Sequence, residues 1–191
     1  MMKFNQLLVA LMCVLLFACS DKTAQENEGK EETVISVSDD IQKKQAYIQE
    51  LEQKVWGQNA QPSDLEAKKL LNAYSAFVNA YRDHEEAPEY MFNAGRLSST
   101  LNKPRKAIEL FTDVHDNFPG YKKRTEAAYL VAFIYDVQLN DREKAERAYE
   151  KVMELYPESP WAEDARVSIN NLYKTDEELI REFEAKNKAA Q

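Results

Sequence analysis

The sequence has few glycines, prolines and cysteines, and it lacks an excess of positive charge. It contains four glycines and six prolines among 191 residues, while 30% of its residues are charged. This composition is typical of a soluble, helix-rich chain, and the length is that of a single domain. The formal net charge of −8 argues against nucleic-acid binding, because nucleic acid requires a basic surface.

Residues that commonly build catalytic or metal sites are also scarce. The two histidines, His84 and His115, have no zinc-type spacing, and we expect both at the surface. Three of the glycines, Gly57, Gly95 and Gly120, are isolated and form no phosphate-binding loop. We therefore expect no catalytic residue, no metal and no cofactor, and we interpret the chain as a protein other than an enzyme.

One unbroken apolar run, Leu7 to Phe17, lies at the N-terminus. It is too short for a transmembrane helix, which needs about 20 residues, and it follows Lys3, so residues 1–18 are predicted to be a signal peptide. Residues 16–19, Leu-Phe-Ala-Cys, resemble a bacterial lipobox. The resemblance implies that Cys19 is lipidated after cleavage. The alternative is an ordinary secretory signal in which this cysteine is incidental.

A polar stretch follows the cysteine. Residues 20–38 contain many charged side chains, and their large apolar residues are Val34, Ile35 and Val37. So few apolar residues cannot order a segment, so we expect a disordered tether over residues 19–38. Its start, Ser-Asp at 20–21, resembles the export signal of Bacteroidetes surface lipoproteins. Cleavage and lipidation would leave no disulfide, so packing alone must stabilise the fold.

The first helix of the folded body is predicted to begin at Asp39 or Asp40, which can cap it. Its apolar residues are Ile41, Ile48, Leu51 and Val55. This pattern fits a short coiled coil or the first helix of a hairpin, and barely two heptads favour the hairpin. Ser63 and Glu66 form a capping box that begins a second helix. Residues 39–86 are therefore interpreted as a degenerate first hairpin.

The stretch from Pro88 to Pro157 repeats itself. The pattern Leu-Asn-x-x-x-Lys-Ala at residues 101–107 returns 38 residues later at residues 139–145. Each copy ends with an aromatic residue and a proline, at 118–119 and 156–157. A fixed period of this size is the signature of stacked supersecondary units. Each unit is predicted to be a helix, a short turn and a second helix that the proline ends.

Gly95, Ala107, Phe111 and Pro119 lie 12, 4 and 8 residues apart. This spacing resembles the tetratricopeptide repeat (TPR), whose period is about 34 residues. The second copy, from Ala132 onward, fits with one extra residue in its inter-helix turn. The longer period resembles the periplasmic repeats of CpoB (YbgF) and BamD lipoproteins. We predict repeats at 87–121 and 122–158. Ala132 at the equivalent position predicts that Gly95→Ala is tolerated.

The last segment, residues 159–191, is predicted to form a C-terminal hairpin. Thr175 and Glu178 make another capping box, and the final helix carries a narrow apolar stripe of Leu179, Ile180 and Phe183. A stripe with a charged back suits a capping helix at a solenoid end. The predicted fold is all-α: a short, right-handed, TPR-like solenoid of about three helical hairpins with a C-terminal capping helix.

The TPR resemblance implies that partner-facing residues lie on the first helix of each hairpin. Carried over by position, the candidates are Glu89, Phe92, Arg96, Tyr129, Phe133 and Asp136. Aromatic residues beside charges suit an extended peptide or a partner helix. The alternative is that Phe92 and Phe133 pack between hairpins.

These observations predict a lipid-anchored protein of the cell envelope that acts as a scaffold for protein–protein interaction. The expected location is the outer membrane, on its periplasmic side, with the membrane contacted through the lipid on Cys19. The expected partner is a protein or peptide, not nucleic acid. The alternative function is a structural one, as a coiled-coil oligomer formed through Ile41–Val55. The sequence leaves the partner and the oligomeric state open.

Overall fold

The computed structural model of the protein describes residues 22–58, 60 and 63–189, with side chains from Ser36 onward. Every regular element in these residues is helical: α1 (Lys22–Trp56), α2 (Asp64–Ala80), α3 (Ala87–Thr100), α4 (Pro104–Asn117), α5 (Arg124–Phe133), η1 (Ile134–Gln138), α6 (Arg142–Leu155), α7 (Pro160–Asn171) and α8 (Asp176–Ala189). The chain divides into two compact units, Met1–Ala46 and Tyr47–Gln191. The all-α class is confirmed.

Helix α1 begins much earlier than predicted. It runs for 35 residues from Lys22, so the start expected at Asp39 or Asp40 is wrong, and residues 22–38 are helical where a disordered tether was predicted. These residues include one glycine and no proline, and the alanine, glutamine, glutamate and lysine among them have high helix propensity. Low hydrophobicity therefore did not prevent a helix. In the first unit, Val37 is 45% exposed.

The end of α1 belongs to the second unit. Ile48, Leu51 and Val55 are almost fully buried there. The hydroxyl of Tyr74 on α2 donates a hydrogen bond to Glu52 at 2.6 Å. This packing favours the hairpin interpretation of α1 and α2. The capping box predicted at the start of α2 is confirmed, because Ser63 and Glu66 exchange both of its hydrogen bonds.

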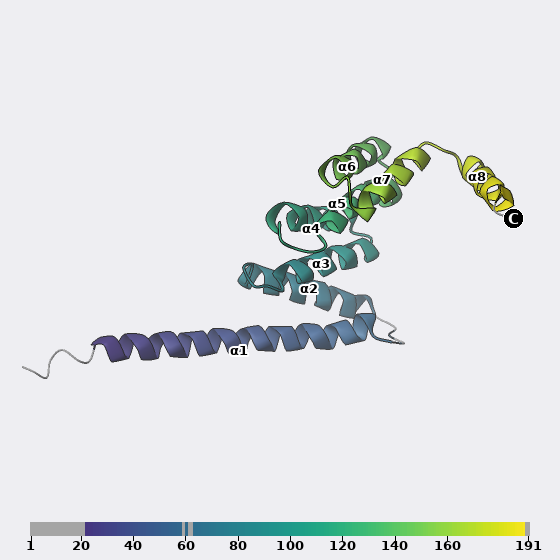
Figure 1. Ribbon diagram of the computed structural model, residues 1–191. Coiled ribbons are helices and arrows are strands. Elements are labelled where there is room, and N and C mark those ends of the chain that lie inside the picture. Colours follow the sequence, from purple (N-terminus) through teal and green to yellow (C-terminus); the bar gives the residue numbers. More distant parts are fainter. Residues whose placement is uncertain (1–21, 59, 61–62, 190–191) are drawn as a thin grey trace, which may run out of the picture. The chain divides into compact units, whose positions relative to one another are not determined.

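Helices α2 to α7 form a solenoid in which each helix packs on the next along the chain (Figure 1). Two of its hairpins, α3–α4 and α5–η1–α6, reverse direction through three-residue turns at 101–103 and 139–141. Each turn contains an asparagine with positive φ, 54° at Asn102 and 49° at Asn140. Asparagine adopts this left-handed conformation more readily than most residues. This explains why both copies carry the Leu-Asn pair.

The extra residue of the second repeat lies inside its first helix, not in its turn. Residues Ile134–Gln138 form a π-helix, whose wider turns accommodate one more residue. The Leu139 N–H donates to Ile134 O, five residues back, whereas the Leu101 N–H donates to Leu97 O, four residues back. The predicted insertion in the turn is therefore wrong, because both turns have the same length and conformation.

Gly95 is a close contact between α3 and α4. A Cβ atom added there would lie 2.8 Å from Cε1 of the Phe111 ring. Phe111 is itself 1% exposed, so the ring has little room to move. The prediction that Gly95→Ala is tolerated therefore conflicts with this geometry, although the predicted helix–helix contact at Gly95 is present.

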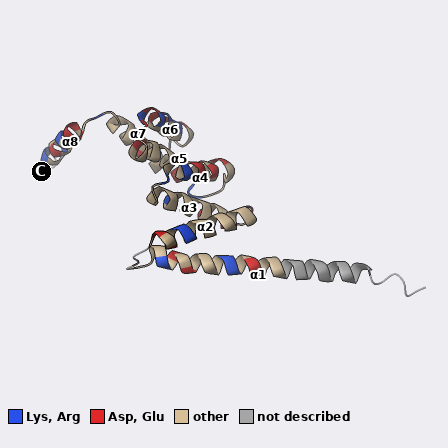
Figure 2. Ribbon diagram, turned by 180° about the vertical axis from the view of Figure 1, so that it is seen from behind, with Lys and Arg blue, Asp and Glu red and all other residues tan. Residues whose placement is uncertain are grey.

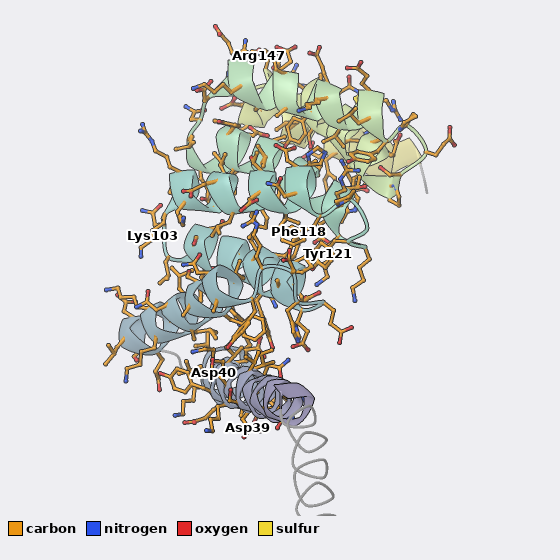
Figure 3. The ribbon with its side chains drawn as sticks, turned by 90° about the vertical axis from the view of Figure 1, so that its left-hand side faces the viewer. Asp39, Asp40, Lys103, Phe118, Tyr121 and Arg147 are labelled. Atoms are coloured by element: carbon orange, nitrogen blue, oxygen red, sulfur yellow. The ribbon has the colours of Figure 1, made fainter. Side chains whose placement is uncertain are left out.

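Successive repeats are joined at the edge where the second helices end. Figure 3 shows Phe118 and Tyr121 there, opposite Lys103 in the α3–α4 turn. Arg82 forms an ion pair with Asp113 at 2.5 Å and lies over the Phe118 ring. His115 lies within hydrogen-bond distance of the Tyr156 hydroxyl, at 2.8 Å, and is 8% exposed. The surface position predicted for His115 is therefore wrong.

Helix α8 begins as predicted, with the capping box of Thr175 and Glu178 in place. Its apolar stripe, however, is not covered: Ile180 is 59% and Phe183 67% exposed. The α7–α8 connection, residues 172–175, has no residue with the positive φ found at Asn102 and Asn140. Helix α7 packs on α5 and α6, but α8 is not among the helices of the described residues that pack closely on another, so α8 does not act as the expected cap.

Candidate protein-binding surface

The predicted partner-facing residues lie on α3 and on the α5–η1 helix, but one of them is not accessible. Phe92 is 1% exposed. Its ring lies 5.3 Å from that of Phe111 and 6.1 Å from that of Tyr121, with the Lys123 ammonium 4.9 Å from its centre. Phe92 therefore packs between hairpins, and its assignment as a partner-binding residue is wrong.

Glu89 also takes part in the joint between repeats. Its carboxylate accepts hydrogen bonds from the Tyr121 hydroxyl at 2.8 Å and from the Lys123 ammonium at 2.6 Å. Burial alone would raise the pKa of Glu89, but these two donors outweigh burial and lower it. The carboxylate is thus held charged by its own chain, and it links α3 to the loop between α4 and α5.

Arg96 points into solvent from α3 and lies beside an aromatic residue that the sequence did not single out for binding. The Arg96 guanidinium is 5.8 Å from the centre of the Trp56 ring. Trp56, the last residue of α1, is 44% exposed. An exposed tryptophan stacked by an arginine presents the two side-chain types that most often dominate binding energy at interfaces.

Tyr129 and Phe133 form the corresponding pair on α5. Their rings stack with centroids 6.4 Å apart. Phe133 is 37% exposed, so the alternative that it packs between hairpins does not describe it. Tyr129 is half-buried, because its ring contacts those of Tyr149 at 5.5 Å and Trp161 at 5.1 Å. Tyr129 therefore supports Phe133 more than it faces solvent.

Asp136 lies in the π-helix and accepts a hydrogen bond from the Tyr149 hydroxyl at 3.3 Å. Burial raises the pKa of Tyr149, which keeps the hydroxyl protonated as a donor. The next two residues behave differently. Val137 is 61% exposed, and the Gln138 amide donates to Ser99 Oγ on α3. The π-helix thus places Asp136 toward α6 and Val137 in solvent.

Four exposed residues on the first helices of three successive hairpins form what we call the first-helix face: Trp56, Arg96, Phe133 and Val137. Arg96 joins it to α1 through Trp56, and Ser99, one turn further along α3, joins it to η1 through Gln138. Tyr129 joins it to α7, since its hydroxyl lies 3.5 Å from Ser168 Oγ. The face therefore spans the first helix of each successive hairpin.

The remaining predicted features concern chemistry and the membrane. Cys19, the predicted lipidation site, lies outside the described residues. In the part of the chain that the structure describes, no three histidine, cysteine, aspartate or glutamate residues gather closely enough to hold a metal ion. In the same residues, no helix combines the length and the apolar character needed to cross a membrane.

Comparison with known proteins identifies one of the repeats. Residues 126–159 match the tetratricopeptide repeat family. This range covers α5 from its third residue, the π-helix, α6 and the following turn. No curated protein sequence matches the chain. The protein therefore contains a TPR within an all-helical solenoid.

Proposed function

We propose that this TPR-containing chain is a lipid-anchored scaffold of the cell envelope that binds a peptide or a helix of a partner protein on its first-helix face. TPRs are protein–protein interaction modules, which supports the general class. The observation that carries the proposal is that Trp56, Arg96 and Phe133 are exposed on the first helices of three successive hairpins. A partner segment laid across the hairpins would contact each of them in turn.

The test of this surface uses exposed residues only. Arg96→Glu reverses a charge, and Phe133→Glu introduces a charge in place of an aromatic ring. Neither variant removes a fully buried side chain, so both should have the melting temperature of wild type. Each should reduce partner capture from membranes by tenfold or more, since interface hot spots contribute about 2 kcal/mol or more. Tyr129→Ala is less suitable, because Tyr129 supports the aromatic core around Tyr149 and Trp161.

A matched control is Arg105→Glu, which makes the same charge reversal at an exposed residue on the second helix α4. The control should leave partner capture unchanged. If Arg96→Glu and Phe133→Glu recover the same proteins at the same yield as Arg105→Glu, the first-helix face is not the binding site.

The membrane part of the proposal rests on the sequence around Cys19. Two acyl chains anchor a protein stably, whereas one is marginal. Cys19→Ser should therefore move the protein from the membrane fraction to the soluble fraction. If the serine variant stays in the outer-membrane fraction as firmly as wild type, lipid anchoring at this residue is wrong. The periplasmic side is tested separately, by protection from protease added to intact cells.

A second candidate function is that of an oligomeric spacer in the envelope. The observation that favours it is that the apolar seam of α1 continues before Ile41 to Val37, which is 45% exposed, whereas Ile48 is buried in the fold of its own chain. An exposed apolar residue on this seam suits a coiled coil. Val37→Asp should then lower the oligomer mass in sedimentation, and a wild-type chain that sediments as a monomer would exclude this function.

A further inference from the structure

The apolar stripe of α8 is uncovered. Ile180 and Phe183 are 59% and 67% exposed, three residues apart and therefore on one side of the helix. Two connections hold this part of the chain in place. The Tyr173 hydroxyl donates to Glu146 on α6 at 2.7 Å, and Lys174 pairs with Glu182 on α8 at 2.7 Å.

The charges of α8 are divided between its two ends. Its first turn carries Asp176, Glu177 and Glu178, and its last turn carries Lys186 and Lys188. Figure 2 shows the blue residues of α8 nearest the C-terminal label and the red ones further away. A helix with one acidic end, one basic end and an apolar centre is complementary to a copy of itself in the opposite direction.

We infer that α8 is a self-association element, in which the α8 helices of two copies of this chain pair antiparallel about a two-fold axis near residue 182. Such an interface is isologous: the same patch is used by both copies. Helical geometry at 3.6 residues per turn brings Ile180 and Phe183 of the two copies together. It also sets Glu177 of one copy opposite Lys188 of the other, because both residues flank the Ile180–Phe183 stripe on the same side.

The charge pattern favours a second copy over an unrelated partner helix. The pairing is closed, because each acidic end meets a basic end and nothing is left to propagate into a filament. The same charges also stabilise α8 in a single chain through its helix dipole. A mixing experiment therefore separates stabilisation of the single helix from pairing between two copies. The inference does not depend on the proposed binding function, since the first-helix face and α8 share no residue.

The mixing experiment uses the full chain with Cys19→Ser, to avoid membrane association, and measures its mass by sedimentation over a range of concentrations. Lys188→Glu places like charges at both symmetric contacts, and so does Glu177→Lys. Each variant alone should dissociate about three- to tenfold more readily than the parent chain, as expected for exposed pairs. An equimolar mixture of the two should restore association, because both contacts are again of opposite sign.

Phe183→Glu tests the apolar centre. It should abolish the dimer and leave the melting temperature unchanged, because the side chain contacts solvent in the single chain. Glu150→Lys, at an exposed position of α6, is the matched control and should leave association unchanged. Association that persists in Phe183→Glu would assign it to another element, such as α1.

Besides association that persists in Phe183→Glu, three results would overturn the inference. One is a parent chain that stays monomeric at all concentrations. Another is a Phe183→Glu variant with a lower melting temperature, which would show α8 packed on its own body. The third is a mixture of Lys188→Glu and Glu177→Lys that associates no better than either variant alone.

Discussion

Replacement of Gly95 by alanine is the sharpest test of how the two helices of a repeat meet. The added Cβ would lie 2.8 Å from Cε1 and 3.0 Å from Cδ1 and Cζ of Phe111. Carbon atoms in van der Waals contact are about 3.5–4.0 Å apart, so the ring must move by roughly 1 Å. The ring is buried and packs at 5.3 Å against Phe92, which leaves it little space.

The two energies that decide the outcome have opposite signs. Overpacking a filled core costs about 1–3 kcal/mol, while alanine in place of a helical glycine contributes about 0.8–1.0 kcal/mol. We therefore expect a net loss of up to about 2 kcal/mol. In a protein of this size each kcal/mol corresponds to about 2–4 °C in melting temperature.

The decisive measurement compares two backgrounds. Phe111→Leu removes the ring that the new Cβ would meet, so in that background Gly95→Ala should stabilise the protein by its helix propensity alone. Thermal and denaturant unfolding is measured for wild type, Gly95→Ala, Phe111→Leu and the double variant. The four free energies of unfolding give the coupling energy, which should be at least about 0.5 kcal/mol for residues in contact. Gly120→Ala is a control, since a Cβ there meets nothing within 4 Å. An identical effect of Gly95→Ala in both backgrounds would refute the proposed contact.

Three further predictions follow from single side chains. Ser98 is fully buried, and its hydroxyl is the one side-chain polar atom of the described residues that is buried without a hydrogen-bond partner, so Ser98→Ala should raise the free energy of unfolding by about 1 kcal/mol. The pKa of Glu89 is lower in the folded chain than its unfolded value, near 4.5. The charged carboxylate therefore stabilises the fold above the unfolded pKa, and this stabilisation is lost as pH falls through the folded pKa. Wild type and Glu89→Gln should differ in melting temperature at neutral pH and converge in acid. Asn140 has a φ of 49°, so Asn140→Val should cost about 1–2 kcal/mol in denaturant unfolding while Asn140→Gly should be close to neutral.

The hairpin architecture could be predicted because the sequence encodes it locally. The Leu-Asn pairs fix the two turns, the small residues at 95 and 132 allow close approach, and the capping boxes at Ser63 and Thr175 begin their helices as predicted. The start of α1 could not be predicted from low hydrophobicity, because polar residues with high helix propensity can continue a helix that nucleates elsewhere.

The candidate site was predicted less completely, because spacing along a helix does not say which neighbour covers it. Phe92 and Phe133 were both assigned to that face, yet the loop residues Tyr121 and Lys123 cover Phe92, whereas Phe133 is 37% exposed. Trp56 was missed as a surface residue because it ends a helix of the degenerate hairpin. Its partner, Arg96, comes from another repeat, and that proximity is set by the stacking of the hairpins.

The π-helix lengthens the second repeat by one residue inside its first helix, and it leaves the asparagine turn and the second helix in register with those of the first repeat. Upstream of Ile134 each residue corresponds to one 37 positions earlier, as Ala132 does to Gly95, and downstream the offset is 38, as for Ala145 and Ala107. An alignment that puts its gap in the turn would therefore misassign residues 134–138 by one position, which on a helix is a rotation of about 100°. Asp136, which faces α6, would be matched with Ser99 instead of the fully buried Ser98. Comparisons of such repeats should place length differences inside the first helix and keep the asparagine turn in register.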